Sequence, residues 1–98
     1  MRALLNAEQI DAHLTQLSGW CLGADRRAIE KSYTFRDFPS AFAFMTHAAF
    51  LAERMNHHPD WSNLFNRVDV RLSTHDAGGL TALDFGLAQA LDGTLPSE

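Results

Sequence analysis

Three histidines and one acid supply the side chains of this sequence that are best suited to proton transfer. His57 and His58 stand side by side before Pro59, His75 ends an alternating segment, and Asp84 lies near the start of an apolar one. Imidazole titrates near neutral pH, so two or three imidazoles around one pocket can both give and take protons. If the fold brings these residues together, we expect general acid–base chemistry.

Pro59 gives a reason for the adjacent histidines to converge. A proline ends a helix and disfavours helical geometry at the residue before it, so the rings of His57 and His58 need not follow the angular step of a helix. Both rings can then face one cleft, and Trp61 offers a flat wall on which an aromatic ring can stack.

Each of these residues also has a simpler explanation. The dipole of a helix favours histidine near its C-terminus without any catalysis, and a tryptophan such as Trp61 is more often part of a core. Asp84 fits a capping carboxylate and His75 a surface residue at a strand end. A metal site is not favoured, because adjacent histidines cannot easily bind one ion and no CxxC or second histidine cluster completes a ligand set.

The composition predicts one globular domain over residues 1–98. The hydrophobic fraction is 46%, and the net charge of −4 argues against nucleic acid as a partner. No apolar run is long enough for a membrane span, and no signal-peptide core is recognisable, so we expect a cytoplasmic protein without membrane contact. Cys21 is the single cysteine; it excludes an internal disulfide, and we expect it to be buried beside Trp20.

The first half of the sequence predicts a helix followed by a hairpin. Asn6 and Gln9 match a capping box, and the apolar spacing carries the helix to about residue 18, before Gly19. Segments 20–22 and 28–35 then alternate between apolar and polar residues around a turn at 23–26, as antiparallel strands do.

The second half repeats this order and adds a final helix. Asp37 caps a helix that runs to about Asn56 and carries two apolar stripes, more than a monomer's surface helix needs. Segments 61–65 and 67–74 form a second hairpin, and a capping box at Thr81 and Asp84 opens the last helix, which stops near residue 92. The order αββαββα predicts an α+β fold: a four-stranded antiparallel sheet with helices packed on one face.

The spacing of the candidate residues resembles a known family signature. Glu53-x-x-x-His57-His58-Pro59-x-Trp61, then Ser73-Thr74-His75, then Asp84 is similar to the pattern of pterin-4a-carbinolamine dehydratases. The resemblance extends from about residue 8 to 92 and includes Leu17-Ser18-Gly19-Trp20, Phe35-Arg36-Asp37-Phe38 and Asn63-Leu64-Phe65-Asn66-Arg67-Val68.

The resemblance implies a hydro-lyase that removes water from 4a-hydroxytetrahydropterin, giving quinonoid dihydropterin and so recycling the cofactor of aromatic amino acid hydroxylases. By this resemblance, His57 and His75 act on the 4a-hydroxyl as acid and base, and His58 binds and orients the pterin. Asp84 orients His75 or the loop, and Trp61 is a wall or support. The remaining signature residues, Pro59, Ser73 and Thr74, bind substrate or support the site.

The same resemblance implies αββαββα subunits that form homodimers or homotetramers, and no cofactor or metal, since the pterin is the substrate. The doubled apolar stripe at residues 38–55 independently favours a contact between helices of two subunits. The alternative is a non-catalytic oligomeric binding or regulatory module on the same scaffold. The intact set of histidines favours the enzyme.

Overall fold

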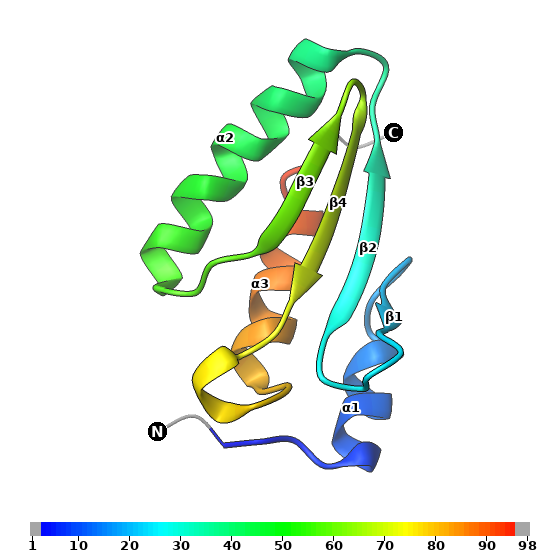
Figure 1. Ribbon diagram of the computed structural model, residues 1–98, viewed down its shortest axis with the longest axis vertical. Coiled ribbons are helices and arrows are strands. Elements are labelled where there is room, and N and C mark those ends of the chain that lie inside the picture. The colour runs from blue at the N-terminus through cyan, green and yellow to red at the C-terminus, as the bar shows by residue number, and fades with distance from the viewer. Residues whose placement is uncertain (1–2, 96–98) are drawn as a thin grey trace.

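The computed structural model describes residues 3–95 and consists of three α-helices and a four-stranded antiparallel sheet. In chain order the elements are α1 (Ala7–Leu14), β1 (Cys21–Leu22), β2 (Ile29–Thr34), α2 (Phe38–Met55), β3 (Asp60–Leu64), β4 (Arg67–Leu72), the 3-10 turn η1 (His75–Ala77) and α3 (Ala82–Asp92). Figure 1 shows this order. The predicted fold class and the sequence of elements are confirmed.

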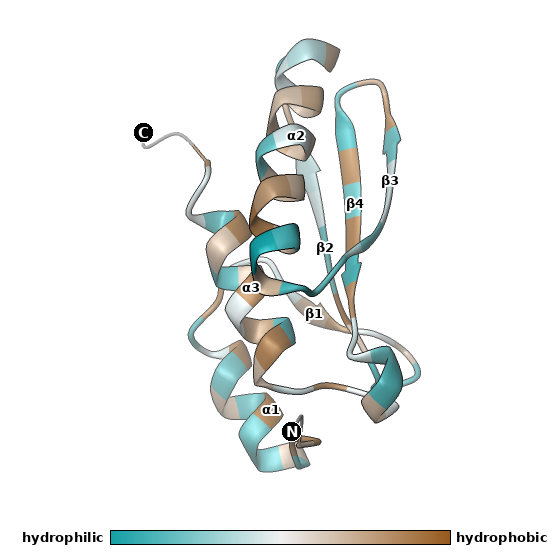
Figure 2. Ribbon diagram, turned by 90° about the vertical axis from the view of Figure 1, so that its left-hand side faces the viewer, coloured by the Kyte–Doolittle hydropathy of each residue, from teal (hydrophilic) through white to brown (hydrophobic). Residues whose placement is uncertain are grey.

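The sheet has the strand order β1-β2-β4-β3, so β1 and β3 are its edges. Its central pair aligns Tyr33 with Val68 and Lys31 with Val70. Alternation places Ile29, Tyr33, Val68, Val70 and Leu72 on the buried face. All three helices cover this face, and the other face is open (Figure 2).

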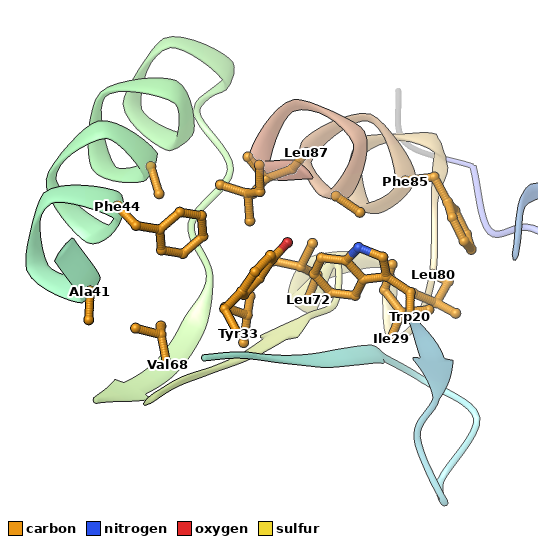
Figure 3. Packing of buried hydrophobic residues seen from close by; sticks show 14 of the residues in the cluster. Trp20, Ile29, Tyr33, Ala41, Phe44, Val68, Leu72, Leu80, Phe85 and Leu87 are labelled. Carbon is orange, nitrogen blue, oxygen red and sulfur yellow. The ribbon is translucent and has the colours of Figure 1, made fainter. Parts of the chain in front are cut away.

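Aromatic side chains fill the space between the sheet and the helices (Figure 3). The ring of Tyr33 lies 4.6 Å from that of Phe44 and 6.3 Å from that of Trp20, measured between centroids. Leu87 and Leu91 of α3 are fully buried in the same cluster. Burying one such side chain contributes about 1.5–3 kcal/mol, so this layer holds the helices on the sheet.

The two apolar stripes of α2 have different surroundings. Ala41, Phe44 and Ala48 of one stripe are buried against the sheet, whereas Phe38 and Phe42 of the other are 46% and 55% exposed. The sequence shows the doubled width but does not tell which stripe is outside. The structure assigns the core to the Phe44 stripe and leaves Phe38 and Phe42, the N-terminal part of the other stripe, on the outer face.

Three local expectations are wrong. Helix α1 ends at Leu14, not near residue 18, because Gln16 and Leu17 make tighter i→i−3 hydrogen bonds. Strand β4 ends at Leu72, and Thr74 instead bridges to Gly79. Cys21 is exposed: alternation along the strand gives the buried side to Trp20.

The predicted helix starts are confirmed. Asn6 with Gln9 and Thr81 with Asp84 both form complete capping boxes, and the Asp37 side chain accepts from the backbone N–H of Ser40. Each such cap stabilises its helix by about 1 kcal/mol. None of the helices in residues 3–95 is long and apolar enough to cross a membrane.

The C-terminal end of α3 is fixed to the sheet through Asp92. Its carboxylate accepts hydrogen bonds from Trp20 Nε1 (3.1 Å), Lys31 Nζ (2.9 Å) and Tyr33 Oη (2.6 Å). Burial, together with the adjacent Asp92 carboxylate, raises the pKa of Tyr33 well above its usual range. The phenol therefore stays protonated while the protein is folded.

This shift predicts a loss of stability at alkaline pH. Tyr33 is the sole tyrosine, and in the unfolded chain it ionises near pH ~10. Because the folded pKa is raised, the stabilisation is complete below that pH and falls above it by about 1.4 kcal/mol per pH unit. Urea unfolding of wild type and Tyr33→Phe between pH 8 and 11 measures this slope. The variant has no phenol at this position to ionise, so this contribution to the slope should be absent from it. Tyrosinate absorbance that rises near pH ~10 without unfolding would contradict it.

Candidate active site

The C-terminus of α2 sends the two adjacent histidines in different directions. Asn56 adopts a left-handed conformation (φ 50°, ψ 44°), the N–H of Asn56 bonds to the carbonyl of Glu53, and the N–H of His57 bonds to that of Ala52. This is a Schellman motif, in which asparagine tolerates the left-handed position. The chain reverses at Asn56, so His57 turns inward while His58 stays at the surface.

His57 is buried and paired with Asp84. The His57 Nε2 atom lies 2.6 Å from Asp84 Oδ1, and the two side chains are 6% and 0% exposed. Because a carboxylate only accepts, the hydrogen of the neutral ring lies on Nε2, which donates to Asp84 Oδ1 and leaves Nδ1 as the acceptor. The pair joins residues 27 positions apart and so fixes the end of α2 to the start of α3.

Asp84 has a second set of partners on its other oxygen. Oδ2 accepts from the Thr74 hydroxyl at 2.8 Å and from the Thr81 backbone N–H at 2.9 Å. Its capping role and its role in the site therefore coexist. Its bonds run to His57, Thr74 and Thr81. Of the two expected roles, orienting His75 or orienting the loop, the bond to Thr74 fits the loop, and the histidine that Asp84 contacts is His57.

His58 and His75 lie on a cavity of about 420 Å³, here called the histidine cavity. Its remaining lining residues are Asp25, Arg27, Pro59, Asp60, Arg71, Ser73 and Gly78. His58 and His75 are both exposed. His58 follows α2 and His75 lies in η1, so two separate segments of the chain bring them to this cavity. This volume lies within the usual range for small-molecule sites.

Polar contacts set the shape of this cavity. His58 Nε2 lies 2.9 Å from Glu53 Oε1, which favours a proton on Nε2 and leaves Nδ1 as the acceptor of the neutral ring. Ser73 Oγ donates to the Arg27 carbonyl at 2.7 Å, tying the end of β4 to the β1–β2 turn.

Charges at the cavity rim are paired. Arg71 binds Glu30 and Asp25 at 2.6 and 2.7 Å. The backbone N–H of Arg27, followed by the Arg71 guanidinium, lowers the pKa of Asp25 below its usual range. Asp25 therefore stays a carboxylate at neutral pH, and Arg71 is held between two anions.

Trp61 and Thr74 do not line the histidine cavity. Trp61 pairs with Val70 across the sheet and, half-buried, packs against the core. It also borders a separate concavity of about 390 Å³, together with Arg67 and Asp69. Thr74 is fully buried. Pro59 and Ser73 do line the histidine cavity. Among residues 3–95, no group of three or more His, Cys, Asp and Glu residues is arranged to hold a metal ion.

Comparison with known proteins identifies the family of this chain. The family model of pterin 4 alpha carbinolamine dehydratase matches residues 3–94. The chain belongs to this family.

Relatives and a solved structure extend the match. A protein of Rhizobium johnstonii named "Putative pterin-4-alpha-carbinolamine dehydratase" is 53% identical over 88 residues, covering 90% of this chain and 87% of that protein. One of the same name from Mesorhizobium japonicum is 52% identical over 93% of both chains. A Brucella melitensis crystal structure described as a transcriptional coactivator/pterin dehydratase has a TM-score of 0.91 at 42% identity, covering 93% and 97% of the two chains. The prediction of a hydro-lyase is confirmed at the level of the family.

Several residues of this dehydratase-family site escaped sequence reasoning as site residues. For Thr81 the sequence signal is its capping box with Asp84. For Glu53 it is the spacing of five residues before His58, which lets the two side chains meet once the helix has ended. Arg27 and Asp25 had no local signal, because only the tertiary fold brings the β1–β2 turn to the cavity.

The buried pair predicts a cost for altering Asp84. Asp84→Asn points an amide N–H₂ at one of the donors that the carboxylate accepts, leaving a buried donor unsatisfied. We expect the free energy of unfolding to fall by about 1–3 kcal/mol. Asp11→Asn, on the exposed side of α1, is the matched control and should stay within about 0.5 kcal/mol. Equal urea midpoints for the two variants would refute a special role for the buried carboxylate.

Proposed function

We propose that this protein dehydrates 4a-hydroxytetrahydropterins to quinonoid dihydropterins by histidine acid–base catalysis in the histidine cavity. The observation that carries the proposal is the meeting of His58 and His75 in one cavity of about 420 Å³, in a chain of the dehydratase family. Two histidines in one cavity are what a reaction needs when one group must donate a proton and another must accept one.

The reaction needs nothing beyond proton transfer. A proton is delivered to the 4a-hydroxyl, the C4a–O bond breaks and water leaves. The N5 proton is lost to a base as the C4a–N5 double bond forms. The substrate takes up one proton at the 4a-hydroxyl and loses one from N5, so one imidazole starts protonated and the other neutral. Each ends in the opposite state, and exchange with solvent resets both in an open cavity.

The proposal assigns the two proton transfers to His58 and His75. The contact with Glu53 supports the assignment of His58. Its carboxylate accepts a hydrogen bond from His58 Nε2, which leaves Nδ1 available to a substrate. Pro59 and Ser73 would bound the pterin ring, and Arg27, which lines the same cavity, would meet polar groups of the substrate.

His57 has a different part in this proposal from the one its family resemblance implies. Its ring is buried, and its Nε2 atom is occupied by Asp84. We therefore assign it to holding the 57–59 segment in place, with Asp84 and Thr74 behind the cavity. A direct role as proton carrier would have to run through Nδ1, and the variants below separate the two roles.

The proposal includes no metal and no cofactor other than the pterin substrate, since proton transfer suffices for the chemistry. The activity assay is therefore run on protein dialysed against a chelator. An activity that disappears on dialysis and returns with a divalent cation would contradict this part.

The main prediction concerns the rate of dehydration. With the 4a-hydroxy adduct generated in situ, wild type should accelerate its decay and show a bell-shaped pH profile. His75→Ala and His58→Ala should each lower kcat/KM by about 10²-fold, the lower end for one acid or base. His13→Gln, on α1 and away from both the histidine cavity and the groove on α2, is the matched control and should be unchanged.

The alternative function is distinguished by the same assay. A non-catalytic binding or regulatory module would leave the adduct to decay at its spontaneous rate, and wild type without acceleration would end the enzymatic proposal. His57→Gln tests the division of roles. Suppose that it abolishes turnover while the stability of the protein and the effects of the His58 and His75 variants on kcat/KM stay unchanged. The assignment of proton transfer to His58 and His75 is then wrong.

We further propose a homo-oligomer that assembles through the outer face of α2. Phe42 and Phe50 are 55% and 68% exposed on this helix, and residues 43–54 border a shallow groove of about 520 Å³ beside Phe50. Figure 2 shows hydrophobic residues along α2. Exposed aromatic residues gathered on one helix are typical of an interaction surface.

A charge on this face should separate the subunits. Phe42→Glu and Phe50→Glu should lower the molar mass measured by light scattering, because a buried carboxylate in the interface lacks a partner. Gln16→Glu adds the same charge in the exposed turn that follows α1 and should leave the mass unchanged. Phe44 and Ala48 are unsuitable sites, since both are core residues. Unaltered mass in both phenylalanine variants would rule out this interface.

A further inference from the structure

Two threonines continue the hydrogen bonding of Asp84 away from the histidines. Thr74 Oγ1 lies 2.7 Å from Thr81 Oγ1 and 2.8 Å from Asp84 Oδ2. The Leu83 backbone N–H reaches Thr81 Oγ1 at 3.2 Å. Thr74, Thr81 and Asp84 are 0%, 2% and 0% exposed, so neither threonine can touch a molecule in the cavity.

The direction of these hydrogen bonds follows from the inventory of donors. An ionised carboxylate only accepts, so the single hydroxyl proton of Thr74 is directed to Asp84. Thr81 must then be the donor in the bond between the two hydroxyls. Its own oxygen accepts from the Leu83 N–H. The chain therefore runs one way, from the first turn of α3 through both hydroxyls to the carboxylate, and has one arrangement of protons.

This chain links the two segments that carry the cavity histidines. Thr74 is the neighbour of Ser73 and His75, and His57 is the neighbour of His58. Both Thr74 and His57 bind the same carboxylate, on opposite oxygens. The position of Asp84 thus sets how the 57–59 segment sits relative to the 73–75 segment.

We propose that Thr74 and Thr81 are positioning residues for the cavity histidines, acting through Asp84. This inference rests on the proposed function for its kinetic consequence but not for its geometry. Because both oxygens of the carboxylate are bonded, through three hydrogen bonds in all, Asp84 cannot rotate without breaking buried hydrogen bonds. A fully satisfied buried network is rigid, and a partly satisfied one is not. Removing the Thr74 hydroxyl frees the carboxylate and loosens the spacing of His58 and His75.

The kinetic test compares two substitutions at one position. Thr74→Val keeps the shape and removes the hydroxyl; Thr74→Ser keeps the hydroxyl. We expect Thr74→Val to lower kcat by about 10- to 100-fold, the scale of a misplaced catalytic group, with KM changed little, because the groups that contact substrate remain. Thr74→Ser should restore kcat to within about threefold. Thr34→Val, at an exposed threonine of β2, is the matched control and should behave as wild type.

A spectroscopic test accompanies it and does not depend on turnover. In wild type, proton NMR should show a slowly exchanging imidazole proton on His57 Nε2 and slowly exchanging hydroxyl protons on Thr74 and Thr81. Thr74→Val should broaden the imidazole proton, and Thr74→Ser should keep it. If Thr74→Val does not fold, the wild-type resonances decide, and absence of both kinds of proton overturns the proposal.

The remaining outcomes separate the two proposals. A Thr74→Val variant equal to Thr34→Val in kcat and in its imidazole resonance overturns the positioning role, as does an equal loss in Thr74→Val and Thr74→Ser. A wild type without dehydratase activity that still shows these resonances, and loses them in Thr74→Val, overturns the proposed function and leaves the hydrogen-bond chain supported.

Discussion

The burial of one carboxylate, that of Asp84, constrains much of this structure. A carboxylate removed from water is strongly destabilising unless its lone pairs are filled. Here the donors come from three places: the end of α2 through His57, the exit of β4 through Thr74, and the start of α3 through Thr81. The N-terminus of α3 adds a favourable dipole. Satisfying Asp84 therefore requires those three chain segments to meet. The neighbours of His57 and Thr74, namely His58, Ser73 and His75, line the histidine cavity.

Helix α3 carries a second carboxylate at its other end, and the two together fix the helix in place. Asp92 accepts from Trp20, Lys31 and Tyr33, all from the β1–β2 region. A carboxylate at a helix C-terminus is unfavourable to the dipole, so the Lys31 ammonium compensates for it. Between these two anchors, Leu87 and Leu91 face the sheet. The helix is thus positioned by polar contacts at its ends and by apolar packing along its length.

The sequence was sufficient for the fold because its signals are local. Alternation marked the strands, and caps at Asn6, Asp37 and Thr81 marked the helix starts. The pairing of His57 with Asp84 carried no such signal, since it joins residues 27 positions apart. Likewise, the two stripes of α2 could be counted, but assigning Phe44 to the core depends on how the helix rotates against the sheet. Relations between elements, rather than the elements themselves, were beyond sequence reasoning.

The adjacent histidines illustrate how a helix end can divide labour between neighbours. The sequence predicts that Pro59 turns both rings to one cleft, but the chain reverses earlier, at the left-handed Asn56. After such a turn, successive side chains diverge, so one ring enters the core and the other stays at the surface. The buried ring of His57 is held by its bond to Asp84. Because one peptide bond joins the two histidines, this contact also fixes the backbone position of His58. Under the proposed function, His57 contributes to stability and His58 to proton transfer, so neither histidine is redundant.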